Sequence, residues 1–294
     1  MLSKLIKYDW KSVCRVEGLL AIIMLAYGLL AAIMLQTPVY SGFVTGHKTT
    51  ESMQAFGFIS GGFGFVALWI LIVGVEIASV IYLAVRFYRS MYDDEGYLTH
   101  TLPSTTMERL GSKLIVGYAW FMVVSLAVVV SLGLIAVSAL IIGHRAGYGF
   151  QQMKDGILEF FPYMPEFLSN NKGTVVHLIV LFVFTALLNP FIRIARVFGA
   201  LTIGQLFKKN RGLMGVVFYF VISWGTSFVL NVVSGIMRAF DVKRVYSLDE
   251  FGSSGFFSRM ITVGNDMSLA VNFAVAVALV FVTRHIIDNK LNLI

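Results

Sequence analysis

Six long apolar runs constrain the fold more than any other feature of the sequence. Hydrophobic residues make up 57% of the 294 residues and charged residues only 13%, whereas a soluble domain carries about 25% charge. A helix of about 20 apolar residues crosses the ~30 Å hydrocarbon core of a bilayer. The sequence therefore predicts an all-α polytopic membrane protein, a single transmembrane domain over residues 1–294, with spans expected at 19–35, 57–83, 114–142, 175–207, 212–236 and 268–282.

The fourth span has two possible ends. Its apolar run is interrupted by Arg193 and Arg196, so the span either stops near Phe191 or continues to Phe207 with both arginines inside. We favour the longer version, in which Asn189 and the two arginines share one helical face, because charged residues within spans usually face a bundle interior. Pro190 would kink this helix.

The N-terminal segment is amphipathic. Apolar residues recur at helical spacing and basic residues fall mostly on the opposite side: Leu2, Leu5, Ile6, Trp10 and Val13 against Lys4, Lys7, Lys11 and Arg15. This pattern predicts a helix at 1–16 that lies in the membrane interface. An ordinary cytoplasmic lead-in to the first span is the alternative.

Small residues gather at the start of the second span. Gly57 and Gly61 form one pair at a spacing of four, and Ser60 and Gly64 form another. Such faces let helices approach closely in lipid, so close helix packing is expected here.

The distribution of Lys and Arg predicts the topology. Six spans place both termini on one side, and the segments on that side hold more Lys and Arg than the others, which favours cytoplasmic termini in a plasma membrane. Residues 86–113 then form a cytoplasmic loop, and 143–174 and 237–267 form outer segments. The net charge of +7 is explained by contact with the lipid bilayer, and no nucleic-acid partner is expected.

The cytoplasmic loop has features of a built structure. Gly96 allows a sharp turn, and Pro103 prevents a continuous helix. Ser104 or Thr105 can cap a new helix that begins at Thr106. We therefore expect a short coupling helix between spans two and three.

No catalytic constellation is visible. The five histidines are dispersed, Cys14 is the single cysteine, and neither a metal site nor a phosphate-binding loop can be recognised. The chain is therefore predicted to be no enzyme and to bind no metal or cofactor of its own.

Glu76 is the acid that the sequence places well inside a span. At 1.5 Å per residue it lies about 15 Å from the inner edge, where an unpaired charge costs roughly 2.5–3.5 kcal/mol or more. Arg193 or Arg196 could pair with it, within one chain or across a dimer. A protonated Glu76 bonded to a backbone carbonyl or to Ser or Thr is the alternative.

The loop and its flanks resemble the membrane subunits of ABC-2 type transporters, which are exporters. The residues that carry the resemblance are Glu95-Gly96-Tyr97-Leu98, Thr101-Leu102-Pro103-Ser104, Gly111-Ser112-Lys113, the piece 203–207 and the tail 288–293. The resemblance implies two paired permeases, either identical or paralogous, and two separate ABC ATPase subunits that bind ATP and Mg. It also implies that the first two motifs and Arg109 contact the ATPase. The substrate stays open among peptide antibiotics, lipids, drugs and glycans, and the mostly apolar interior favours export of an amphiphilic substrate such as a peptide antibiotic, lipid or drug.

Two other functions stay open. An intramembrane acid such as Glu76 can serve as the ion or proton site of a secondary transporter, although the two halves of the chain show no internal repeat. A membrane enzyme or sensor-like scaffold is the third possibility. An ATPase encoded in the neighbouring reading frame would favour the ABC exporter subunit over the secondary transporter and over the enzyme or scaffold.

Overall fold

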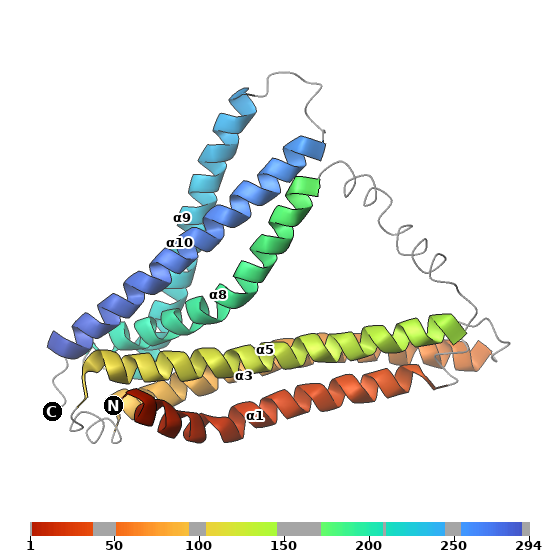
Figure 1. The fold of residues 1–294 in the computed structure, drawn as a ribbon, viewed down its shortest axis with the longest axis horizontal. Coiled ribbons are helices and arrows are strands. Elements are labelled where there is room, and N and C mark those ends of the chain that lie inside the picture. The colour runs from red at the N-terminus through yellow and green to blue at the C-terminus, as the bar shows by residue number, and fades with distance from the viewer. Residues whose placement is uncertain are drawn as a thin grey trace. The chain divides into compact units, whose positions relative to one another are not determined.

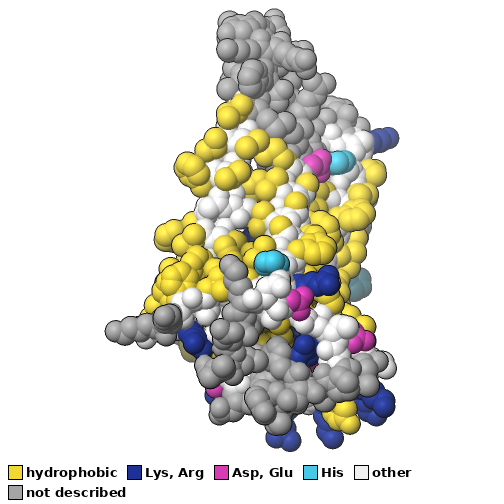
Figure 2. Space-filling model, turned by 90° about the vertical axis from the view of Figure 1, so that its left-hand side faces the viewer, with side chains coloured by type: hydrophobic (Ala, Val, Ile, Leu, Met, Phe, Trp, Pro, Cys, Tyr) yellow, Lys and Arg dark blue, Asp and Glu magenta, His cyan; other side chains and the backbone are white. Residues whose placement is uncertain are grey.

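Six long α-helices make up the regular structure of the described residues, which in this computed structural model are 2–37, 51–93, 104–145, 172–207, 210–244 and 254–289 (Figure 1). All six are long and apolar enough to cross a membrane, which confirms six helices capable of spanning, and no strand occurs among these residues. The helices are α1 (Leu2–Leu35), α3 (Glu51–Tyr92), α5 (Thr106–Arg145), α8 (Lys172–Gly204), α9 (Arg211–Arg244) and α10 (Ser254–Asn289). Figure 2 shows hydrophobic side chains over much of one face, as expected for helices in contact with lipid.

The helices extend beyond the apolar runs. α3 has 42 residues and α5 has 40, which at 1.5 Å per residue gives about 60 Å, twice the thickness of the hydrocarbon core. Two predicted boundaries are absent. Residues 2–16 continue without a break into the first span, and the segment after Pro103 continues into the third. Neither α1 nor α5 contains a proline that would end it. The expected short helix is thus the first part of α5, and an interfacial position for 2–16 stays a prediction.

α8 follows the longer version of the fourth span. It runs from Lys172 to Gly204 with Pro190 inside it, so both arginines lie within the helix. The turn to α9 contains Asn210, whose φ of 55° is a left-handed conformation that asparagine tolerates. Gly204 lies so close to α9 that a Cβ there would be 2.4 Å from the backbone nitrogen of Gly215. α8 and α9 therefore form a tight helical hairpin.

The predicted outer segments differ from expectation where they are described. Of residues 143–174, 146–171 lie outside the described residues. Residues 237–244 continue α9 and 254–267 belong to α10, so much of the second segment is helical rather than loop.

The chain divides into two compact units. One contains residues 11–82 and 119–164, and its core is formed by apolar residues of α1, α3 and α5, including Met24, Val75 and Val124. α1 and α5 approach closely at Gly28, where a Cβ would lie 2.5 Å from the Cβ of Ser131. The hydroxyl of Ser131 donates to the carbonyl of Met24 at 2.9 Å, as small polar residues do between helices in membranes.

The predicted close packing on α3 is not found at Gly64. A Cβ on Gly64 would meet no atom within 4 Å in the described part of the chain. Its carbonyl instead accepts a hydrogen bond from the hydroxyl of Tyr27 at 2.8 Å. The close approach in this unit is made by Gly28 because the partner helix there presents a small serine.

The other unit contains residues 1–10, 83–118 and 165–294. In it α8 packs against both α9 and α10. Ile192, Ala195 and Ala276 form a buried cluster between α8 and α10, and this packing positions the polar residues of both helices.

Candidate functional site

Most of the predicted ATPase-coupling residues lie outside the described residues. These are Glu95, Gly96, Tyr97, Leu98, Thr101, Leu102 and Pro103. Arg109, which follows them on α5, is described, as are both helix ends that flank the loop. The site can therefore be built from its base.

A capping box begins α5. The backbone N–H of Glu108 donates to Oγ1 of Thr105 at 3.3 Å, and the backbone N–H of Thr105 donates to Oε2 of Glu108 at 3.0 Å. These reciprocal bonds satisfy two donors that a helix start leaves unpaired. The predicted cap is thus confirmed at Thr105. Glu108 thus helps to fix the start of the helix.

Arg109 is buried rather than presented on the surface. Only 8% of it is exposed, and its guanidinium donates to Oγ1 of Thr106 at 3.3 Å. Together with Arg284 and Asp288 of α10 it lines a cavity of about 430 Å³. Arg109 therefore faces a cavity shared by the start of α5 and the end of α10, and its role in ATPase contact stays a prediction.

Asp9 ties the N-terminal end of α1 to α5. Its Oδ1 pairs with Nζ of Lys113 at 3.2 Å, and its Oδ2 accepts a hydrogen bond from the hydroxyl of Ser112 at 2.7 Å. Both carboxylate oxygens are thus used. Sequence reasoning missed Asp9, although it quoted Ser112 and Lys113 as part of the motif; the one signal was an acid on an otherwise basic helix.

The end of α3, on the other side of the loop, is anchored to α8. The hydroxyls of Tyr92 and Thr202 are 2.6 Å apart. One turn earlier the rings of Phe87 and Phe198 stack, with centroids 3.9 Å apart and planes 7° apart. Both helices that enter the loop are therefore held by polar and aromatic contacts.

Among the described residues the most deeply buried acid is Glu17, which sequence reasoning did not single out. It is 0% exposed, and its Oε2 accepts a hydrogen bond from the hydroxyl of Ser79 at 2.8 Å. The signal was a single acid directly before the first apolar run. Glu76 is half-buried on α3 and belongs to a different unit from the arginines of α8, so its pairing with Arg193 or Arg196 stays a prediction.

Arg196 has a partner on α10. Its guanidinium donates to the side-chain carbonyl of Asn272, and the amide nitrogen of Asn272 donates in turn to the hydroxyl of Ser268 at 3.2 Å. Arg193 is half-buried three residues earlier. A short polar network therefore connects α8 and α10 inside the apolar helices.

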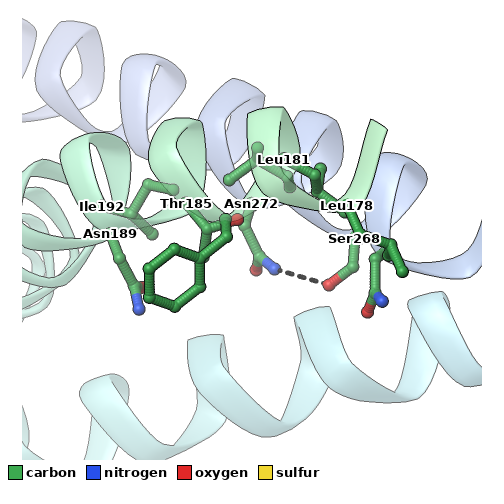
Figure 3. Close-up of a pocket in the computed structure, with 10 residues that line it drawn as sticks. Leu178, Leu181, Thr185, Asn189, Ile192, Ser268 and Asn272 are labelled. Carbon is green, nitrogen blue, oxygen red and sulfur yellow. Dashed lines mark hydrogen bonds between the residues drawn. The ribbon is translucent and has the colours of Figure 1, made fainter. Parts of the chain in front are cut away.

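This network adjoins a cavity of about 440 Å³ between α8 and α10 (Figure 3). Asn189, which the sequence placed on one face with the arginines, lines it together with Thr185. The other lining residues are Leu178, Leu181, Phe182, Ile192, Asn265, Ser268, Leu269 and Asn272. A volume of this size suits a small ligand or part of a larger one.

Among the described residues, no group of three or more His, Cys, Asp or Glu comes together that could hold a metal ion. No family model, no curated protein and no solved structure matches this chain.

Proposed function

We propose that this chain is the membrane-spanning subunit of an ATP-driven exporter of the ABC-2 type, and that a separate ABC ATPase works it from the cytoplasm. The order of the loop motifs and the six-span layout support the proposal. In this account two permeases pair in a bacterial plasma membrane, and ATP and Mg bind to the partner ATPase.

The observation that carries the proposal is the construction of α5. It is capped where the loop ends and continues without a break through the length of a membrane span. A capped, continuous helix is a stiff connection, so a push on its first turn would move its membrane part. The ion pair between Asp9 and Lys113 would make the N-terminal part of α1 move with it.

Co-purification tests this function. The ATPase encoded beside this chain, recognised by its Walker A motif, should remain bound to the tagged chain in mild detergent. A neighbouring frame without such an ATPase, or an ATPase that elutes separately, would argue against the proposal.

The proposed orientation has a test of its own. In a Cys14→Ser background, Ser3→Cys introduces one exposed thiol near the N-terminus. A membrane-impermeant maleimide should label it in inside-out vesicles and leave it unlabelled in intact cells. Labelling in intact cells would show that the N-terminus lies outside, which is the opposite of the proposed topology.

Glu17 favours a second candidate function, ion-coupled transport. It adds to Glu76 a fully buried carboxyl group whose Oε1 has no hydrogen bond within the described part of the chain. Buried acids in spans mark proton and ion paths. This function requires that the chain alone, in vesicles with a proton gradient and no nucleotide, sustains transport that Glu17→Gln or Glu76→Gln abolishes.

A further inference from the structure

Two polar contacts between α8 and α10 lie near the cavity, one toward each end of it. At the outer end of the predicted topology, Nε2 of His177 lies 2.9 Å from a carboxylate oxygen of Asp266. At the other end stands the hydrogen bond from Arg196 to Asn272. α8 and α10 run in the same direction, and in the predicted topology both begin on the outer side. The cavity therefore lies nearer to their outer ends.

The polar residues that line the cavity in the described part of the chain are uncharged. It consists of three carboxamides and two hydroxyls, from Asn189, Asn265, Asn272, Thr185 and Ser268. A carboxamide both donates and accepts hydrogen bonds, and it complements another amide or a hydroxyl. Among the described residues, no Asp, Glu, Lys or Arg lines the cavity, and an ion without a counter-charge is costly at this depth.

Two of these polar side chains, Thr185 and Asn189, are available to a ligand. Asn272 is not, because its hydrogen bonds to Arg196 and Ser268 fix its orientation. The side chains of Thr185 and Asn189 form no hydrogen bond within the described residues. A polar group in an apolar medium without a partner costs free energy, so a ligand that supplies the partner gains affinity.

The remaining lining is apolar and reaches the outside of the helix pair. Leu178, Leu181 and Leu269 lie on the walls, and Phe182 is 73% exposed. An acyl chain attached to a group in the cavity could therefore lie against Phe182 while its polar end stays among the carboxamides.

We propose that this cavity binds the uncharged amide group of an amphiphilic substrate, with Asn189 and Thr185 as its direct hydrogen-bonding partners. The inference rests on the proposed export function and specifies the substrate class. The Arg196–Asn272–Ser268 network acts as a positioning element, because it holds one carboxamide at a fixed angle toward the cavity.

Photo-crosslinking of the full-length chain in lipid nanodiscs tests the site without any ATPase. The probe is dodecanamide with a diazirine in its acyl chain. We expect crosslinks on residues 178–192 and 265–272, which unlabelled dodecanamide should displace. Dodecanoate or dodecyltrimethylammonium at the same concentration should not displace them. Equal displacement by the charged competitors, or crosslinks spread evenly over all helices, would overturn the proposal.

Variants of matched chemistry make the test specific. Asn189→Leu keeps the side-chain size and should weaken the apparent affinity for dodecanamide about fivefold, the effect of losing one hydrogen bond; Thr185→Val should act in the same direction. Asn231→Leu makes the same change at an exposed asparagine of α9 and should have no effect. Unchanged affinity in folded Asn189→Leu would refute the site.

Failure of the site and failure of the proposed function can be told apart. Specific crosslinking by a chain that binds no ATPase would support the site and reject the exporter. A chain that does bind its ATPase but shows no specific crosslinking would leave the exporter standing and reject the site.

Discussion

Asp9 and Lys113, 104 positions apart in the sequence, form an ion pair of 3.2 Å that joins the N-terminal end of α1 to the beginning of α5. The side chains of Lys113 and Asp9 are only 11% and 20% exposed, so the pair is better shielded than a surface salt bridge. Because Lys113 lies at the end of the segment 86–113 that is predicted to be cytoplasmic, the pair would link two segments that the proposed mechanism moves together.

Removing one partner of this pair should destabilise the protein. Asp9→Asn removes the negative charge that faces the ammonium group of Lys113 and should cost about 1–3 kcal/mol. Thermal unfolding of the chain in nanodiscs measures this loss of stability. The double variant with Lys113→Met should lose less than the two single variants added together. Lys11→Met, at an exposed lysine of α1, is the control, and strict additivity would mean that the pair contributes nothing.

Gly28 should tolerate no side chain. Gly28→Ala places a methyl group 2.5 Å from the Cβ of Ser131, and the overlap forces α1 and α5 apart at a cost of about 1–3 kcal/mol. Gly18→Ala on the same helix meets no atom within 4 Å and should be neutral or slightly stabilising. Equal thermal stability of both variants would show that the close approach does not exist.

The bond between Ser79 and Glu17 yields a third prediction. Ser79→Ala removes the donor from a carboxyl group that is 0% exposed, and we expect the free energy of unfolding to fall by about 1–3 kcal/mol. Ser227→Ala changes an exposed serine of α9 and should have little effect. Should Glu17→Leu, which removes the acid, restore the stability of Ser79→Ala, the penalty comes from the unsatisfied carboxyl group, as we predict. No loss in Ser79→Ala would contradict this account.

Met107 offers a test of coupling that avoids the buried Arg109. It lies in the first turn of α5 and is 39% exposed, so a change there should alter a docking surface rather than the core. Met107→Asp should reduce stimulation of the partner ATPase about tenfold, as truncation of an interface residue can do, while the level of the membrane protein stays the same. Met107→Leu is the conservative control. Equal stimulation by both variants would place the contact elsewhere.

The helices were predictable because their signal is local. Each apolar run specifies its own helix, and the Thr105 cap and the continuation of α8 past Pro190 could be inferred from neighbouring residues. The partners were not predictable. Periodicity does not indicate that Asp9 meets Lys113, that Arg196 meets Asn272 or that Glu17 meets Ser79, since each pair joins different helices. Helix ends were also underestimated, because polar residues can continue a helix beyond the membrane when no proline intervenes.

The rate of ATP hydrolysis by the neighbouring ATPase, measured with and without this chain in lipid vesicles, tests the central claim most directly. If the chain is a membrane subunit driven by that ATPase, the two proteins should sediment together and the chain should change the hydrolysis rate. An unchanged rate, with all of the ATPase left in the supernatant, would contradict the account.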